Sequence, residues 1–354
     1  MIVGACGFGS TGSSVVTDYL REFDSVTVKD DFEFTWVPKV DGLIDLERAV
    51  MNPHFRTSDS SVAIRRFEKL VKRLALTYEI HGLPRDDFEK MIEAFIDAIT
   101  TVKWVGYSNE NKSENLSVRF ADYFMRRKVI PKLERKAGHQ LSCWPLREVR
   151  VSVHPDNFYV EAQKLVDTML GRMGMNTNGI IALDQPFSGN NPQACFPFFR
   201  DPYAVVVDRD PRDNYVFART KLLGRNHFMA VEPVEDFIAY YRALRKDQPY
   251  LRSDDRVMIL KFEDMVYEYE DTTAKLRAFL KLPENPRPKS VFDPALSVAN
   301  TQVFLRFPEF AEDVKKIERE LPDYLFDYSR YPTPDPKGKM FFGKSPLNPG
   351  KPRK

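Results

Sequence analysis

The sequence is poor in the residues that bind metals or form disulfides. Its three cysteines, Cys6, Cys143 and Cys195, are far apart and odd in number. This argues against a disulfide framework and predicts a protein of a reducing compartment. The five histidines form no pair with ligand-like spacing. We therefore expect no metal in the functional site.

Long apolar runs are also missing. No stretch approaches the ~18 apolar residues of a membrane span, and the short apolar start continues directly into a glycine-rich segment rather than a cleavage site. We expect a cytoplasmic protein without a membrane span. The net charge of only +2 argues against a chain whose main function is to bind nucleic acid.

Apolar residues are plentiful, at 43% of the 354 residues, and are sufficient for a large core. Short buried runs alternate with stretches of helical period along most of the chain. This alternation predicts an α/β fold with a mainly parallel sheet flanked by helices. The expected strands after the one at the N-terminus are 26–29, 179–183, 203–207 and 257–262. The expected helices with the clearest signals are 59–78, 84–99, 116–130, 156–173, 211–223, 234–245, 271–280 and 310–321.

The organisation expected is one α/β domain over residues 1–330 with a helical insertion at about 42–140. Helix 116–130 is expected to stop before Pro131, and its basic residues 126–128 to form a solvated face. Residues 331–354 carry six basic residues against one acidic residue. We expect this basic tail to be mobile in the absence of a ligand. The sequence leaves the oligomeric state open.

The first distinctive motif follows the N-terminal strand directly. It contains three glycines and four hydroxyl residues: Gly7, Gly9, Ser10, Thr11, Gly12, Ser13 and Ser14. A glycine loop between a strand and a helix directs backbone N–H groups toward one point, which suits a phosphate. We therefore expect these seven residues to bind a nucleotide-type cofactor. A simple tight turn with Ser13 as the helix cap is the alternative.

Three nucleotide interpretations fit the loop. The pattern from Gly7 to Gly12 matches G-x-G-x-x-G, with Asp30 or Asp31 following the next strand as a ribose-binding acid of an NAD(P) oxidoreductase. It also matches the P-loop of a kinase or NTPase, except that Ser13 replaces the lysine, and Asp208 would then hold magnesium. The third interpretation is a loop for the 5′-phosphosulfate of an adenosine cofactor.

A second motif, Arg-Asp-Pro-Arg-Asp at 209–213, follows the buried strand 203–207. Two arginines at a strand-to-helix turn can hold a phosphate through forked hydrogen bonds. We therefore expect Arg209 and Arg212 to bind the cofactor. From spacing alone, an exposed turn in which these arginines pair with the neighbouring aspartates is equally compatible.

With both motifs, the sequence resembles the sulfotransferases that use 3′-phosphoadenosine 5′-phosphosulfate (PAPS). In that family an N-terminal strand–loop–helix binds the 5′-phosphosulfate and R-D-P-R-D binds the 3′-phosphate. A Y/F-E-D element and F-L-x-L-P follow, here Phe262-Glu-Asp264 and Phe279-Leu-Lys-Leu-Pro283. The resemblance covers about 1–30 and 179–285. It implies a P-loop-like sulfotransferase architecture, PAPS as co-substrate and no metal.

The sequence departs from the family pattern at two positions. Ser10 stands where the family has a lysine or arginine that stabilises charge on the breaking bond, and Phe217 stands where a serine contacts the 3′-phosphate. The late G-x-x-G-x-W-K loop of the family has a faint counterpart at 337–344. The missing cation leaves a non-catalytic nucleotide-binding protein open as an alternative.

Sulfuryl transfer also requires a base for the acceptor hydroxyl. Asp184, at the end of a buried strand, is the first candidate, and His154 is the second. Asp184 is also compatible with a structural role as a turn cap, and His154 with a role as a helix-entry residue. The resemblance implies structural roles for Glu263 and Asp264. The expected partner is a small-molecule, glycan or lipid acceptor, and the sequence leaves its identity open.

Overall fold

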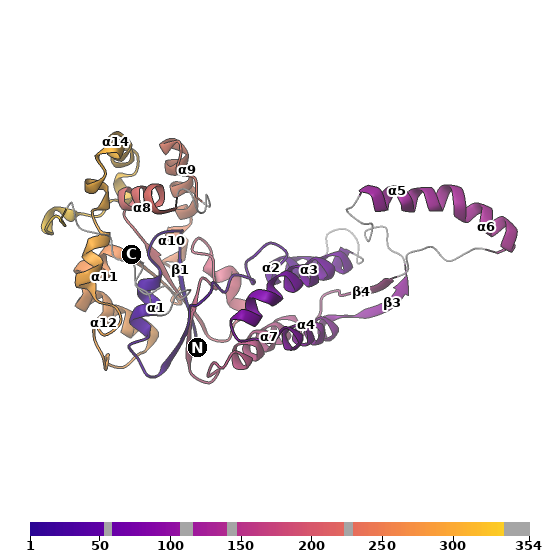
Figure 1. Ribbon diagram of the computed structural model, residues 1–354. Coiled ribbons are helices and arrows are strands. Elements are labelled where there is room, and N and C mark those ends of the chain that lie inside the picture. Colours follow the sequence, from indigo (N-terminus) through magenta and orange to yellow (C-terminus); the bar gives the residue numbers. More distant parts are fainter. Residues whose placement is uncertain (53–58, 107–115, 140–146, 223–228, 336–354) are drawn as a thin grey trace. The chain divides into compact units, whose positions relative to one another are not determined.

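The computed structural model describes residues 1–52, 59–106, 116–139, 147–222 and 229–335 (Figure 1). The chain divides into two compact units. The first comprises Met1–Pro38 and Leu170–Lys354, and the second comprises Lys39–Met169. The expected counterpart of the late family loop at 337–344 and most of the basic tail lie outside the described residues.

A parallel five-stranded sheet forms the centre of the first unit. Its order is β2-β5-β1-β6-β7, and every neighbouring pair is parallel. The strands are β1 (Ile2–Gly7), β2 (Val26–Lys29), β5 (Ile180–Asp184), β6 (Pro202–Asp208) and β7 (Val257–Lys261). The prediction of a mainly parallel α/β fold is confirmed, and the continuous apolar runs of the inner strands reflect burial on both faces.

Strand β1 lies in the middle of the sheet, at the point where the strand order reverses. From β1 the chain runs to the edge strand β2, returns to β5 beside β1, and then crosses to β6 on the other side. Ligands of open α/β sheets bind outside the carboxyl ends of the strands at such a reversal. The register places Asp184 beside Ala5 and Val207 beside Gly7 at that edge.

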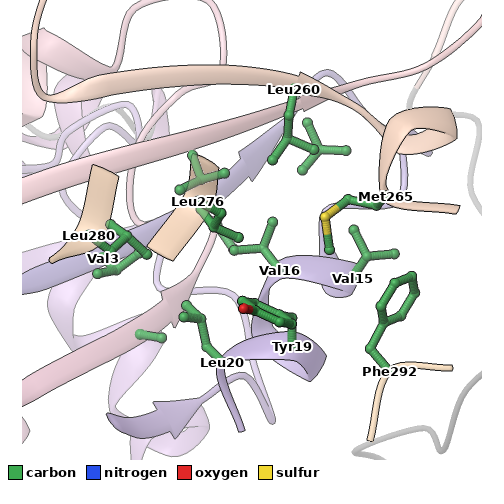
Figure 2. Packing of buried hydrophobic residues seen from close by; sticks show 14 of the residues in the cluster. Val3, Val15, Val16, Tyr19, Leu20, Leu260, Met265, Leu276, Leu280 and Phe292 are labelled. Carbon is green, nitrogen blue, oxygen red and sulfur yellow. The ribbon is translucent and has the colours of Figure 1, made fainter. Parts of the chain in front are cut away.

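Helices α1 (Ser14–Leu20), α11 (Phe262–Tyr267) and α12 (Tyr269–Leu280) pack against the sheet. Figure 2 shows Val15, Val16 and Tyr19 of α1 among apolar side chains of the strands and of α11 and α12. Tyr19 and Leu20 are fully buried, as the apolar spacing of this helix predicts. This packing fixes the start of α1, and with it the end of the glycine loop.

A second apolar cluster of the first unit gathers residues of α8 (Pro211–Phe217), α9 (Val234–Arg245) and α14 (Ala311–Glu320). The predictions for 234–245 and 310–321 are therefore confirmed. The predicted helix 211–223 is α8 followed by a π-helical turn at Ala218–Leu222. The remaining helical segments of this unit are Pro192–Phe198, α10 (Gln248–Leu251), α13 (Pro294–Ser297), Val298–Asn300, Val303–Arg306, Pro308–Phe310, Pro322–Tyr324 and Tyr328–Arg330.

The second unit is mainly helical. Its elements are α2 (Leu43–Met51), α3 (Asp59–Ile80), α4 (Arg85–Ile99), β3 (Val102–Gly106), α5 (Leu116–Phe124), a π-helical turn (Met125–Val129), α6 (Ile130–Ala137), β4 (Arg147–Val151) and α7 (Phe158–Arg172), whose C-terminal end belongs to the first unit. Helix α4 buries the predicted apolar stripe, including Phe88, Phe95 and Ile99. The antiparallel pair β3–β4 was not predicted, because its first strand is largely exposed.

Within the described residues, no helix has the length and apolar character needed to cross a membrane.

The prediction that a helix ends before Pro131 is wrong. The helix continues from α5 through the π-helical turn into α6, with Pro131 in the first turn of α6. A proline removes one backbone donor and crowds the carbonyl of the preceding turn. The wider π-helical turn accommodates this local disruption of the helical hydrogen-bond pattern, so the chain remains helical to Ala137.

Candidate functional site

The glycine loop connects β1 to α1 through left-handed backbone conformations. The φ angles are +87° at Gly9, +53° at Ser10 and +87° at Gly12. A Cβ atom on Gly12 would lie 2.7 Å from the Phe262 ring. Position 12 therefore needs glycine both for its backbone conformation and for the close approach of Phe262.

Three side chains of the first unit hold this loop. Asn214 Nδ2 donates a hydrogen bond to the Gly9 carbonyl at 3.0 Å, and an Arg209 terminal nitrogen donates to the Ser10 carbonyl at 3.4 Å. Gln185 Nε2 donates to Ser13 Oγ at 2.9 Å. Ser13 does not cap α1 with its side chain, which corrects the alternative interpretation of this residue.

The backbone N–H groups of loop residues 9–14 have no hydrogen-bond acceptor in the described part of the protein. They donate no hydrogen bond there, although the carbonyls of Gly9 and Ser10 accept hydrogen bonds from Asn214 and Arg209. Backbone N–H groups are rarely left unpaired, so six donors without a partner in the described protein indicate a site for water or a ligand. Successive amides in left-handed turns form concavities that bind anions. The loop can therefore bind a phosphate or sulfate group.

Arg209, predicted to bind the cofactor, lies against the loop. The residue is only 3% exposed, and its guanidinium lies 5.0 Å from the ring centroids of both Phe217 and Phe262. Besides the Ser10 carbonyl it contacts the Asn300 carbonyl, while its buried Nε has no partner in the described part of the chain. The structure thus brings the two sequence motifs together, with a cation and an unused donor next to the loop.

Arg212 has a different environment. Its guanidinium donates to both carboxylate oxygens of Asp210, at 3.0 and 2.7 Å, to Glu318 at 3.0 Å and to the Phe326 carbonyl at 3.0 Å. A phosphate would have to displace these acceptors. The phosphate-binding role of Arg212 therefore stays a prediction, and the contacts in the structure favour the salt-bridged turn that the sequence left open.

Three buried carboxylates fix the turn after β6. Glu263 Oε1 accepts a hydrogen bond from the Asp210 backbone N–H at 3.0 Å. Tyr328 donates to Asp213 at 2.7 Å and to Glu263 at 3.2 Å. Burial, together with the charges of Asp210 and Asp213, raises the pKa of Glu263 to about 8. Glu263 thus has the structural role that the resemblance implies, because it orients the turn that carries Arg209.

The raised pKa of Glu263 predicts a pH-dependent stability. Its pKa in the folded protein lies above the ordinary glutamate value of 4.5, so the folded state retains a proton that the unfolded state releases. The stability linked to this proton is fully present below pH 4.5 and is lost as the pH rises through about 8. As the pH rises from 5 to 8, the free energy of unfolding should therefore fall less for Glu263→Gln than for the unmodified protein. Thermal unfolding should show a difference between the two slopes of up to about 1.4 kcal/mol per pH unit.

The matched control is Glu284→Gln, because the Glu284 side chain is 91% exposed. This variant should keep the pH dependence of the unmodified protein. Identical slopes for Glu263→Gln and the unmodified protein would contradict the account of the buried carboxylates.

Asp184, the first candidate base, ends β5 beside β1. Its backbone carbonyl accepts a hydrogen bond from Phe34, and within the described ranges its carboxylate has no hydrogen-bond partner. Burial, with smaller contributions from the charges of Glu33 and Asp30, raises the pKa of Asp184 to about 7. A carboxylate with this pKa can accept and release a proton near neutral pH.

His154, the second candidate base, belongs to the second unit. It is exposed and has a φ angle of +46°, and its backbone N–H donates to the Val50 carbonyl at 2.9 Å. These contacts match the structural alternative for this residue. A catalytic role for His154 stays a prediction.

The two rival nucleotide interpretations have specific difficulties in this structure. In a dinucleotide-binding fold the second strand of the chain lies beside the first, whereas β5 lies between β1 and β2 here. Asp30 is paired with Arg21. Asp208, the candidate magnesium ligand of a P-loop enzyme, is 6% exposed and is bound by Arg245 at 2.6 Å and by Gln248 at 2.9 Å. Both acids are therefore already occupied.

Sequence reasoning missed two residues that hold the loop. Asn214 directly follows the Arg-Asp-Pro-Arg-Asp motif, and Gln185 directly follows Asp184. Their positions beside predicted site residues were the available signal. A single amide side chain at such a position has no pattern of its own, and its partner in the loop is 172 or more residues away.

In comparisons with known proteins, no family model and no curated protein matches this chain. Among solved structures, it is similar to a sulfotransferase domain from the curacin biosynthetic pathway, with a TM-score of 0.39 and 11% sequence identity. The match covers 83% of this chain and 77% of that domain. A likeness this distant indicates nothing about the function of this chain.

Proposed function

We propose that this chain is a sulfotransferase that binds PAPS at the glycine loop and transfers the sulfuryl group to the hydroxyl of an acceptor. The observation that carries the proposal is the run of six open backbone donors at residues 9–14, held in place by Arg209 of the second motif. The sequence resemblance adds PAPS as the donor.

Donor binding is assigned to the loop and to Arg209. The amides of residues 9–14 bind the oxygens of the 5′-phosphosulfate. Arg209 is the candidate for the 3′-phosphate, because its Nε has no partner in the described part of the chain. Hydrogen bonds between charged groups are stronger than those between neutral groups. The site residues need no metal for this binding mode.

The transfer step needs a base and a stabilised leaving group. The Asp184 carboxylate takes the proton of the acceptor hydroxyl as the new oxygen–sulfur bond forms. The bond between sulfur and the phosphate oxygen breaks, and its electron pair goes to the 5′-phosphate of the product, adenosine 3′,5′-bisphosphate. The loop amides stabilise that charge, since fixed donors act without reorganisation during the reaction.

Ser10 favours a second candidate function, a nucleotide-binding protein without turnover. The family's cation is missing at this position, and the guanidinium of Arg209 contacts the Ser10 carbonyl instead. In this alternative the loop would still bind the donor, but the leaving group would lack charge stabilisation.

The test is release of adenosine 3′,5′-bisphosphate from PAPS in the presence of carbohydrate, lipid and phenolic hydroxyl acceptors. A sulfotransferase releases the bisphosphate only with an acceptor of the right class and forms the sulfated product in equal amount. Donor binding without release for every class supports the non-catalytic alternative. Absence of donor binding contradicts both functions.

A further inference from the structure

One long helix of the second unit leaves most of its described side chains exposed. It runs from Leu116 to Ala137 through α5, the π-helical turn and α6, and ends at Gly138 in a left-handed conformation. Between Met125 and Ala137 no side chain is buried. Most helices in proteins are stabilised by packing of an apolar face, so this helix is suited to an external partner.

The first half of this helix exposes large aromatic residues on one side. Phe120, Tyr123 and Phe124 are 72%, 57% and 50% exposed. The spacings of three and four residues place them on one face. Exposed clusters of large apolar residues mark interaction sites.

The second half of the helix is strongly basic. Residues 125–137 contain six basic residues and one acidic residue, a net charge of +5, whereas the remaining sequence carries a net charge of −3. Four of the basic residues are exposed and have no ion pair among the described residues: Lys128, Lys132, Arg135 and Lys136. Their spacing places them along one side of the helix.

We propose that the helix 116–137 docks on an anionic phospholipid surface. Aromatic side chains prefer the boundary between headgroups and acyl chains, and unpaired basic side chains are attracted to anionic headgroups. A helix that combines aromatic and basic side chains, without the hydrophobicity needed for a membrane span, binds in the plane of the interface. The charge complementarity favours this occupant over a second copy of the chain, which would bring two basic faces together. The proposal does not depend on nucleotide binding.

The test is flotation of the full-length chain with vesicles of phosphatidylcholine plus phosphatidylserine, and with vesicles of phosphatidylcholine alone. The chain should bind the anionic vesicles and not the neutral ones. Combined Lys128→Gln, Lys132→Gln, Arg135→Gln and Lys136→Gln substitutions should weaken binding by about 600-fold, since each basic residue near such a surface contributes about fivefold.

A matched control removes the same number of charges from exposed basic residues elsewhere, with Arg48→Gln, Arg85→Gln, Lys164→Gln and Lys315→Gln. It should leave binding nearly unchanged. This control is needed because the basic C-terminal tail also attracts anionic surfaces. A second variant, with Phe120→Ser, Tyr123→Ser and Phe124→Ser, should lose binding while it keeps the far-ultraviolet circular dichroism of the folded protein.

Three results would overturn the proposal. The first is no binding of the unmodified chain to anionic vesicles. The second is equal loss of binding in the control and in the helix variant that lacks four charges. The third is a dimer in solution that the aromatic substitutions dissociate, without vesicle binding, because that would identify the helix as a protein interface.

Discussion

Replacing Asp184 with asparagine is expected to lower the rate of sulfuryl transfer by about 10²- to 10⁴-fold, the usual contribution of a general base. The asparagine keeps the size of the side chain but cannot take the proton of the acceptor hydroxyl. Binding of adenosine 3′,5′-bisphosphate should change less than twofold, because the loop and Arg209 are untouched. Steady-state turnover and calorimetric binding separate the two effects.

The pH dependence of turnover gives this prediction a second readout. Burial, with smaller contributions from Glu33 and Asp30, raises the pKa of Asp184 to about 7. The carboxylate is the active form, so the rate should rise as the pH increases through 7 and then level off. The small residual activity of Asp184→Asn should lack this inflection. Asp254→Asn, at a carboxylate paired with Arg256 on the same unit, is the control and should keep it. Turnover of Asp184→Asn at the original rate would exclude Asp184 as the base.

Replacing Arg209 with alanine should weaken the binding of adenosine 3′,5′-bisphosphate about 10- to 100-fold, because a hydrogen bond to a charged group contributes about 1.5–3 kcal/mol. Adenosine 5′-phosphate, which lacks the 3′-phosphate, should lose much less affinity. Some loss for both ligands is expected, since Arg209 also binds the Ser10 carbonyl. Calorimetric titration of both ligands into the same variant measures the difference directly.

Two controls distinguish ligand binding by Arg209 from a structural role. Arg242→Ala removes a half-exposed arginine of α9 that pairs with Glu320, and it should leave both affinities unchanged. Arg209→Lys keeps the charge but lacks the planar fork whose two terminal nitrogens contact the carbonyls of Ser10 and Asn300, and it should retain part of the selectivity. Equal losses for the two ligands in Arg209→Ala would assign this residue to loop support alone.

The fold was largely predictable because its main elements carry strong local signals. The buried runs of β1, β5 and β6 alternate with helices whose starts are marked by glycine or proline, and their order fixes a parallel sheet. The short helix α11 was not predicted, since its six residues follow β7 directly and give too little periodicity. The continuation of the helix from α5 past Pro131 into α6 depends on a π-helical turn, which has no recognised sequence signal.

The candidate site was predictable only in part, because its partners come from distant segments. Spacing indicated that Arg209 and Arg212 lie at one turn, but it could not show that Glu318 and Phe326, more than 100 residues later, bind Arg212. The contact between Arg209 and Ser10 spans 199 positions. The contact between Arg209 and Ser10 follows from the pairing of β1 with β6 in the sheet, which a local sequence pattern does not encode.

The most direct test of the central claim is calorimetric titration of the protein with adenosine 3′,5′-bisphosphate, with ATP–magnesium and NADH as parallel titrants. We predict tight binding of the bisphosphate that does not change when magnesium is removed, and weak binding of the other two. Tight binding of NADH or of ATP–magnesium, with little affinity for the bisphosphate, would contradict the proposed function and assign the glycine loop to one of the rival nucleotide sites.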